Sequence, residues 1–489
     1  MRTSILEGIP EGRVFIGGEW LGTAAGRSFP TFNPATGEAL GSVPLADAAD
    51  VDRAVGAAAE AFPGWAATPG PERGRRLRAL AAALREGRED LARLDAINSG
   101  NVISGMRKDV DWAADSLEYF AGLIPEVKGE TLPTGPTAFS YTLREPFGVV
   151  GKINPFNHPI RFAAEKLAAP LAAGNTVVMK PPEQAPLSSL VLARLLRDIF
   201  PPGAVNIVTG DGPTTGAALV RHPKVRRIAL IGSVQAGRAV MQAASPELKT
   251  VTLELGGKNP IIVFPDVAVE DAVSAAVTAM NFNRAGQSCS STSRVFVHRS
   301  RHDGFVEALR GRLAGLRLGP PESDESEIGP LISREQHQRV LAYIEAGRRE
   351  GARLVCGGGA PDDPDLRRGF FVRPTLFDAV RPEMRIAQEE IFGPVMAVLT
   401  WDDEEEMVRQ VNGVIYGLSA AIYTRDYTAA HRLARRLEAG YIWVNFPGGH
   451  ELGSPYGGIK QSGIGREECL DELLSYTQVK SVRMHLPPR

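Results

Sequence analysis

The sequence predicts an α/β fold, and three observations lead to that class. Short β-rich runs alternate with helix-like stretches through the middle of the chain, which is typical of parallel sheets covered by helices on both faces. A second alternating block follows, from about residue 260 to residue 446. The chain of 489 residues is long enough for two or three domains. Two such blocks in series indicate two domains with a cleft between them, a common place for a functional site.

Residues 1–125 are expected to be mostly helical. Apolar residues recur at helical spacing in 48–62 and in 71–97, and the Pro/Gly-rich segment PGWAATPGP separates these stretches.

The alternating blocks each supply five predicted strands. Residues 159–173, between the first two strands, predict a helix with Gly174 as its C-cap. The first five strands are VVGKINPF (149–156), NTVVMKP (175–181), AVNIVTG (204–210), RRIALIG (226–232) and VTLELGG (251–257). The second five are PIIVF (260–264), RVFVH (294–298), PVMAVLTW (394–401), SAAIYT (419–424) and GYIWVNF (440–446).

The composition excludes several classes of protein. The net charge is −2, from 55 basic and 57 acidic residues, which gives no electrostatic argument for nucleic acid or a membrane surface. No apolar run reaches the ~18 residues of a membrane span. The three cysteines, Cys289, Cys356 and Cys469, are odd in number and far apart, which argues against a disulfide framework. We therefore expect a cytoplasmic enzyme without a membrane segment.

Two glycine-rich turns are candidates for phosphate binding. The first, at 210–216, follows a predicted strand but is one residue too long for the G-x-G-x-x-G pattern, so it also fits a plain strand-to-helix turn. The second, at 232–237, places Ser233 where it could cap a helix whose free N–H groups face a phosphate.

Cys289 lies in the stretch FNRAGQSCSSTSR and has three possible roles. Metal ligation is disfavoured, because no C-x-x-C or H-x-x-x-H pattern and no nearby histidine accompanies it. A packed apolar cysteine is possible. The small polar neighbours Gln287, Ser288 and Ser290 fit a turn where a thiol stays reachable, as a nucleophile requires. A cysteine hydrolase would also need a histidine, and His158 beside Asn157 is the only candidate pair.

Eight motifs occur in an order that covers nearly the whole chain. They are NPFNHP (154–159), KPPEQAP (180–186), GS-x-x-x-G (232–237), LELGGKNP (253–260), GQSCS (286–290), EEIFGPV (389–395), GYIWVN (440–445) and SPYGGIKQSGIGRE (454–467). Together they resemble the NAD(P)-dependent aldehyde dehydrogenase superfamily. The pair LELGGK and G-Q-x-C is the most specific part of the resemblance.

The resemblance implies the oxidation of an aldehyde to a carboxylic acid with NAD as hydride acceptor. Cys289 aligns with the thiol that forms a thiohemiacetal and then a thioester. Asn157 and the Cys289 N–H match the donors to the oxyanion. Glu254 matches the base that activates water to hydrolyse the thioester. Lys166 and Glu467 resemble a proton-relay pair of some members, although a structural ion pair is equally consistent.

The resemblance also implies a set of residues that bind NAD, and no metal. Lys180 and Glu183 match contacts to the adenosine ribose, and the acid at Glu183 favours NAD while leaving NADP possible. Glu390 and Phe392 match contacts to the nicotinamide ribose and ring. The remaining implied residues are Ile153, Asn154, Pro155, Gly212, Gly232, Ser233, Leu255 and Gly256.

The fold implied by the resemblance has three parts. A Rossmann-like NAD-binding domain would comprise 1–131 and 147–255, and an α/β catalytic domain 256–460. A small β oligomerisation flap would combine 132–146 with 470–489. The period-two pattern of 475–484 fits an edge strand that pairs with a neighbouring subunit, so we expect a homodimer or homotetramer.

The expected substrate tunnel departs from common members of the superfamily. Arg161 and Glu165 stand where many members have apolar groups; they could face the tunnel or pair with each other at i, i+4. His450 and Tyr456 align near the substrate mouth. The sequence shows no set of aromatic residues that would form a cage around a quaternary ammonium group, which disfavours betaine aldehyde as the substrate.

Three other activities remain to be weighed. A relative that transfers the acyl group to CoA is disfavoured, because that route needs no hydrolytic base such as Glu254. A catalytically silent member is disfavoured by the presence of Cys289, Glu254 and Asn157 together. Slow cleavage of active esters without NAD is a possible side activity. Semialdehydes and aromatic aldehydes both remain possible substrates.

Overall fold

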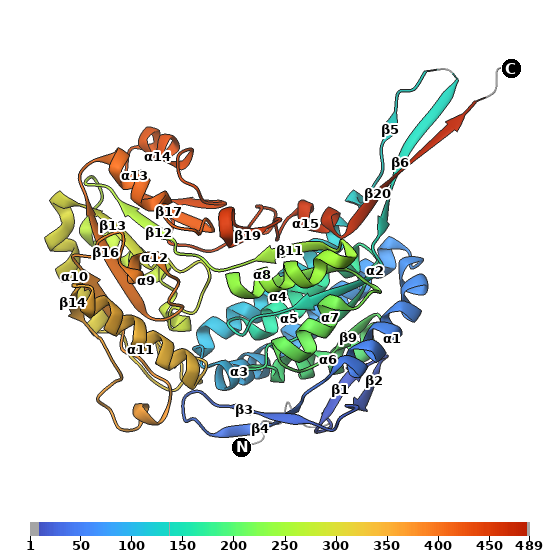
Figure 1. The fold of residues 1–489 in the computed structure, drawn as a ribbon, viewed down its shortest axis with the longest axis horizontal. Coiled ribbons are helices and arrows are strands. Elements are labelled where there is room, and N and C mark those ends of the chain that lie inside the picture. The colour runs from blue at the N-terminus through green and yellow to red at the C-terminus, as the bar shows by residue number, and fades with distance from the viewer. Residues whose placement is uncertain (1–8, 136, 487–489) are drawn as a thin grey trace.

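A computed structural model describes residues 9–135 and 137–486, which fold around two large sheets (Figure 1). The first sheet has eight strands, and its five central strands are parallel. In spatial order they are β19 (Gly463–Ile464), β11 (Thr250–Glu254), β10 (Val225–Ile231), β7 (Val149–Ile153), β8 (Thr176–Lys180), β9 (Val205–Ile207), β1 (Arg13–Ile16) and β2 (Glu19–Gly22). The predicted α/β class is therefore confirmed, with antiparallel strands at both edges.

The order of these strands reverses at β7. The chain adds β8 and β9 on one side of β7 and then adds β10 and β11 on the other side. Parallel sheets bind ligands at such a switch point, beyond the carboxyl ends of the strands. Here the reversal places the segments after Ile153 and Ile231 next to each other.

Eight helices accompany the first sheet, either packed on its strands or in a layer outside those helices. They are α1 (Ala48–Ala66), α2 (Gly70–Glu86), α3 (Arg88–Ser99), α4 (Ile103–Leu123), α5 (Pro159–Ala172), α6 (Leu187–Ile199), α7 (Ala217–Arg221) and α8 (Val234–Ala244). In α5 every residue except Arg161 is buried, and Gly174, with a φ of +92°, follows its end as predicted.

The N-terminal region differs from its mostly helical prediction. Four strands precede the first helix: β1, β2, β3 (Ser28–Phe32) and β4 (Ala39–Pro44). Each has only four to six residues, too short for a clear periodicity, and β1 pairs with β9 from far along the chain. The predicted helix at 71–97 is two helices, which meet at Gly87. The predicted break at Pro63 lies inside α1, whose last turn is anchored by the buried Trp65.

The second sheet contains the five strands predicted for the second block. Its spatial order is β14 (Arg353–Cys356), β15 (Thr375–Asp378), β16 (Val395–Trp401), β13 (Arg294–His298), β12 (Pro260–Val263), β17 (Ser419–Tyr423) and β18 (Tyr441–Val444). The sequence interpretation missed the edge strand β14 and its neighbour β15. The accompanying helices are α9 (Val269–Ala279), α10 (His302–Ala314), α11 (Arg334–Arg349), α12 (Arg385–Gln388), α13 (Glu404–Asn412) and α14 (Tyr427–Ala434).

After β18 the chain returns to the first sheet and joins the two halves. Strand β19 pairs with β11, and the Leu255 N–H donates to the carbonyl of Ser462 at 2.9 Å. The Ser462 hydroxyl donates to the carbonyl of Gly256 at 2.7 Å. These bonds fix the end of β11 between the two sheets.

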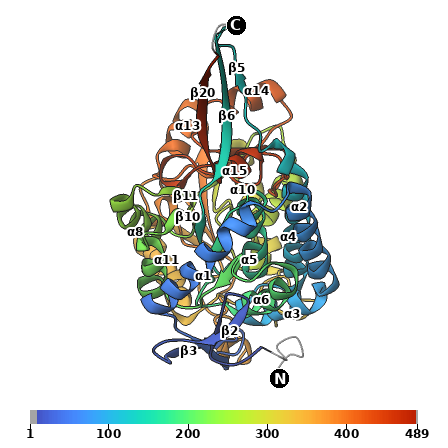
Figure 2. The same cartoon turned by 90° about the vertical axis from the view of Figure 1, so that its right-hand side faces the viewer.

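A third sheet projects from the body of the protein (Figures 1 and 2). It is formed by β5 (Thr131–Leu132), β6 (Ala138–Pro146) and β20 (Thr477–His485), which follows α15 (Leu470–Ser475). Strands β20 and β6 pair antiparallel from Thr477 opposite Pro146 to His485 opposite Ala138. Exposed apolar side chains on this arm are Leu132, Phe139, Leu143, Val479 and Met484. Across 9–135 and 137–486, no helix combines the length and apolar character of a bilayer span.

Candidate functional site

The structure brings Cys289, Glu254 and Asn157 to the junction of two cavities. All three line a cavity of about 160 Å³ that also contains the end of β10 and the start of α8. Cys289 and Glu254 also line a second cavity of about 240 Å³, which extends toward α4 and α5. A thiol and a carboxyl group are therefore reachable from two sides.

The loop that carries Cys289 is fixed by contacts to its backbone. Gly286 has a φ of +70°, and a Cβ atom there would lie 2.4 Å from the carbonyl oxygen of Gly393, so only glycine fits. The Asn259 side-chain amide donates to the carbonyls of Cys289 at 2.7 Å and Ser291 at 3.0 Å. Asn259 belongs to the LELGGKNP motif, but its role in orienting the cysteine loop was not anticipated.

The Cys289 thiol lies in an acidic, largely buried environment. Burial and the carboxyl group of Glu254 raise the thiol pKa well above its ordinary value. The Tyr456 hydroxyl oxygen lies 3.9 Å from Sγ. The resting thiol is therefore protonated at neutral pH and must lose its proton before it can act as a nucleophile.

Glu254 occupies the last position of β11 and is 4% exposed. Burial, and next the charge of Glu467, raise its pKa to about 8. Its Oε1 atom makes no hydrogen bond with any residue that the structure describes. A carboxyl group with a pKa near neutrality and a free oxygen atom suits a general base.

Asn157 lies between β7 and α5 and is 3% exposed. Its carbonyl oxygen accepts a hydrogen bond from the Asn101 side chain at 3.0 Å, which fixes the peptide. Its own side-chain amide has no hydrogen-bond partner among the described residues. Since this amide lines the cavity of Cys289, it is free to donate to a substrate oxygen.

A buried triad holds the turn next to Asn157. The carboxylate of Asp109, on α4, lies 2.9 Å from Nδ1 of His158 and 2.6 Å from Nη2 of Arg284. Burial lowers the pKa of His158 to about 4, so its imidazole is neutral near pH 7. Asp109 lies in a segment without a motif, and Arg284 was not singled out although it lies in the stretch that carries Cys289.

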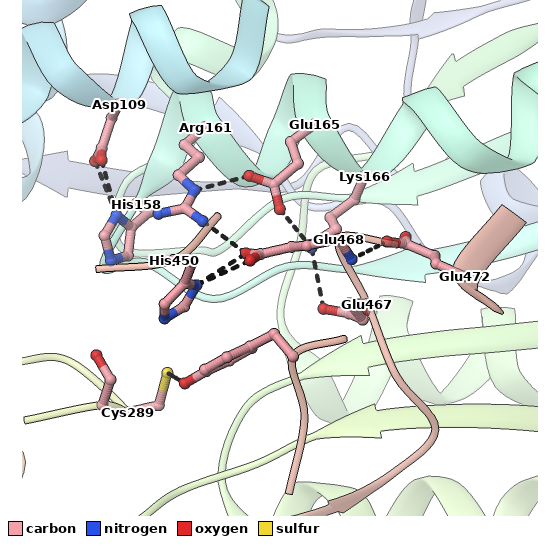
Figure 3. Close-up of polar contacts among 12 residues, drawn as sticks. Asp109, His158, Arg161, Glu165, Lys166, Cys289, His450, Glu467, Glu468 and Glu472 are labelled. Atoms are coloured by element: carbon pink, nitrogen blue, oxygen red, sulfur yellow. Dashed lines mark hydrogen bonds and ion pairs between the residues drawn. The ribbon is translucent and has the colours of Figure 1, made fainter. Parts of the chain in front are cut away.

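Lys166 and Glu467 meet inside the protein, within a larger ionic network (Figure 3). Lys166 Nζ lies 3.0 Å from Glu467 and 2.5 Å from Glu165. Burial lowers the pKa of Lys166, but the carboxylates of Glu165 and Glu467 outweigh burial and raise it well above its ordinary value. The ion pair considered in the sequence is therefore present.

Arg161 extends the same network to the wall of the larger cavity. It pairs with Glu165 at 2.7 Å and with Glu468 at 2.9 Å, so the predicted i, i+4 pair forms. Arg161 nevertheless lines the cavity, while its guanidinium carbon lies 4.6 Å from the centre of the Trp112 ring. Both alternatives for Arg161 therefore hold, and the cavity is polar as well as aromatic.

Six of the predicted cofactor residues line the smaller cavity. Ser233 caps α8 by accepting a hydrogen bond from the Ala236 N–H at 3.1 Å. Because the capped helix begins at the cavity, its remaining first-turn N–H groups offer an anion site. The six are Pro155, Gly232, Ser233, Gly256, Glu390 and Phe392. Gln336 and Arg339 of α11 also line it and were missed, because their segment resembles an ordinary surface helix.

The other six predicted cofactor residues lie outside this cavity. Lys180 ends β8 and pairs with Glu183 at 2.7 Å. Asn154 turns inward and donates to the carbonyl of Phe162 at 3.1 Å. The remaining three are Ile153 at the end of β7, Gly212 at the start of a π-helical turn, and the buried Leu255.

The site fits a dinucleotide and a covalent nucleophile. Its elements are a helix start for phosphate, glycines that allow close approach, a thiol, a base and a free amide. Over the described parts of the chain, no cluster of three or more His, Cys, Asp or Glu side chains could hold a metal ion.

Comparisons with known proteins give one consistent result. The protein-family model described as "Aldehyde dehydrogenase family" matches residues 20–482. The aldehyde dehydrogenase tropH of Talaromyces stipitatus is 48% identical over 97% of this chain and 93% of its own length.

Solved structures agree with the sequence comparison. An NAD⁺ complex of aldehyde dehydrogenase from Bacillus cereus is 40% identical, with a TM-score of 0.95 over 98% of this chain and 97% of its own. Betaine aldehyde dehydrogenase from Staphylococcus aureus in complex with NAD⁺ is 35% identical, with a TM-score of 0.97. This match covers 100% of this chain and 97% of that one.

Proposed function

The chain belongs to the aldehyde dehydrogenase family, and from this premise we propose that it oxidises an aldehyde to the carboxylic acid, with NAD as hydride acceptor. One observation carries the proposal. Cys289, Glu254 and Asn157 meet where a cavity suited to a dinucleotide joins a second cavity open to a substrate.

Cys289 begins the reaction by losing its thiol proton to solvent, and the resulting thiolate attacks the aldehyde carbon to give a thiohemiacetal. The oxygen of that adduct carries negative charge, and the Asn157 amide and the Cys289 N–H donate to it. When bound in the smaller cavity, NAD would supply the hydride acceptor, and Cys289 would then hold the acyl group as a thioester. Glu254 then takes a proton from water, the resulting hydroxide attacks the thioester carbon, and the Cys289 sulfur leaves as thiolate.

Particular residues would hold NAD. The start of α8 at Gly232 and Ser233 suits the pyrophosphate, while Glu390 and Phe392 suit the nicotinamide half. Lys180 and Glu183 suit the adenosine ribose, and the Glu183 carboxylate repels a 2′-phosphate. We therefore propose a preference for NAD over NADP.

The substrate cavity disfavours a quaternary ammonium substrate. Aromatic side chains do line it, namely Trp112, Phe162 and Tyr456. However, the Arg161 guanidinium already lies over the Trp112 ring, so a second cation there would meet a like charge. The aldehyde is therefore proposed to be neutral or anionic.

The projecting sheet is proposed as the oligomerisation flap of a homodimer or homotetramer. Its exposed apolar residues and the free edges of β20 and β5 suit pairing with a second copy. In this proposal the NAD-binding and catalytic domains correspond to the first and second large sheets with their helices.

The test is the increase in NADH absorbance with a panel of neutral, carboxylated and trimethylammonium aldehydes. We expect the protein to reduce NAD with at least one aldehyde of the panel. Cys289→Ser should abolish this rate. The matched variant Cys356→Ser should retain it, since Cys356 lies in the edge strand β14. No NAD-dependent rate with any aldehyde, or a rate that survives Cys289→Ser, would contradict the proposal.

A further inference from the structure

Tyr456 has a hydroxyl group that the chemistry above does not use. The side chain is 3% exposed, and its oxygen lies 3.9 Å from Sγ of Cys289. That oxygen has no other hydrogen-bond partner among the residues the structure describes. Buried phenols normally find a strong acceptor, so a tyrosine whose only partner is the nucleophilic sulfur is not an ordinary core residue.

The ring of Tyr456 is held firmly in this position. It stacks on His450, with the ring centres 3.8 Å apart and an angle of 26° between the planes. His450 Nδ1 lies 3.0 Å from the Glu468 carboxylate, which in turn pairs with Arg161. The backbone of Tyr456 exchanges two hydrogen bonds with Glu467, at 3.1 and 2.8 Å. The hydroxyl is therefore aimed at Sγ by a rigid support.

The surroundings of Cys289 call for a neutral hydrogen-bond donor. The carboxyl groups that act on the thiol, Glu254 and Glu390, oppose the thiolate when they are ionised. No cation pairs with Sγ within the described residues. Burial, together with the nearby Cys289 and Glu254, raises the pKa of Tyr456 well above its ordinary value, so the phenol keeps its proton and remains a donor.

We propose that Tyr456 is a further catalytic residue, whose O–H donates to the Cys289 sulfur whenever that sulfur carries negative charge. This occurs twice in the proposed function on which the inference rests: before the sulfur attacks the aldehyde and when it leaves the thioester. The phenol keeps its proton in both steps. A hydrogen bond to an ion is roughly twice as strong as one between neutral groups, and such bonds are often long in the resting enzyme.

The test is the pH dependence of Cys289 alkylation by iodoacetamide, without cofactor or aldehyde, followed by mass spectrometry of the labelled peptide. Tyr456→Phe removes the oxygen but keeps the ring stack. We expect its alkylation midpoint to move upward by about one pH unit, with alkylation about tenfold slower at pH 7. The matched control is Tyr441→Phe, because Tyr441 packs 5.5 Å from the same ring and its hydroxyl makes no hydrogen bond with the described residues.

A second substitution tests the strength of the donor. Incorporation of 3-fluorotyrosine at position 456 keeps the ring and makes the phenol a stronger donor, so we expect the midpoint to move downward. A profile of Tyr456→Phe that matches the unmodified protein, or a fluorotyrosine shift in the upward direction, would overturn the proposal. The readout needs no turnover: a shifted profile in a protein that oxidises no aldehyde would retain Tyr456 as the thiolate donor and reject the proposed function instead.

Discussion

Glu390 closes against Gly256 so tightly that a Cβ atom built on Gly256 would lie 2.0 Å from Glu390 Oε2. The other carboxyl oxygen, Oε1, accepts a hydrogen bond from the Gly257 N–H at 3.1 Å. Burial raises the pKa of this carboxyl to about 7. The turn after β11 therefore has the shape that Glu390 needs in order to reach the proposed nicotinamide end of the site.

Gly256→Ala should displace Glu390 and weaken NADH binding by about tenfold, equivalent to about 1.4 kcal/mol. Fluorescence titration with NADH measures the Kd directly. Gly311→Ala is the control, since nothing lies within 4 Å of a Cβ atom at that position in α10. Equal Kd values for Gly256→Ala and the unmodified protein would show that Glu390 does not contribute to NADH binding.

Glu254→Gln should separate the two halves of the reaction. The first hydride transfer needs only Cys289 and the oxyanion donors, so the burst of NADH should persist. Steady-state turnover should fall by about 10²–10⁴-fold because water is no longer activated. Rapid quenching and mass spectrometry should show acylated Cys289. Glu247→Gln, at an exposed acid, should behave like the unmodified protein, and unchanged turnover of Glu254→Gln would exclude its role as the base.

The pH dependence of thioester hydrolysis follows from the raised pKa of Glu254. With a pKa of about 8, the carboxyl is mostly protonated at pH 7 and mostly ionised at pH 9. Hydrolysis of preformed acyl-enzyme should therefore accelerate by about tenfold over this range, since the ionised fraction rises from about 9% to about 91%. Single-turnover release of the acid measures the step after the thiol has reacted. A rate that falls with pH, or a sigmoid retained in Glu254→Gln, would contradict the assignment.

The sequence was informative where function resides in contiguous motifs. Cys289, Glu254 and Asn157 each lie in a motif, and the structure brings all three to one cavity. Local composition also identified α5 and the central strands, because elements that are buried on all sides are mostly apolar along their length.

The residues that support the site could not be predicted, because their partners are distant in the chain. Asn101 has no local signature, yet its side chain fixes the peptide of Asn157, which lies 56 positions away in the chain. Asp109 has no local signature, and only the packing of α4 against α5 places it beside His158. Strand β1 was missed for the same physical reason, since it pairs with the distant β9, and its four residues carry too little local propensity to identify it.

Glu183→Ala should increase NADP use relative to NAD by about tenfold, the effect of about 1.4 kcal/mol. The structure gives two reasons. The substitution removes a negative charge near the expected 2′-phosphate, and it releases the Lys180 ammonium from its 2.7 Å ion pair. The ratio of kcat/KM for the two cofactors measures the effect. Glu247→Ala is the charge-matched control, and an unchanged ratio in Glu183→Ala would exclude this carboxylate as the discriminator.

Lys166→Met should destabilise the protein by about 3–5 kcal/mol, because it leaves buried carboxylates without their cation. Lys166 is the cation that Glu165 and Glu467 share, and its side chain is 3% exposed. Lys460→Met breaks the exposed pair with Glu438 and should cost no more than about 1 kcal/mol. Denaturant unfolding measures both, and equal losses would contradict a buried ionic role.

Adding Glu165→Gln to Lys166→Met distinguishes an ion pair from a proton relay. The second substitution removes one stranded charge, so stability should partly return whichever role Lys166 has. If Lys166 only balances charge, the pH profile of thioester hydrolysis should return with stability. If Lys166 and Glu467 carry protons from Glu254, hydrolysis should remain slow in the stabilised double variant, because no ammonium links the two carboxyl groups. Recovery of stability together with the normal pH profile would therefore exclude the relay.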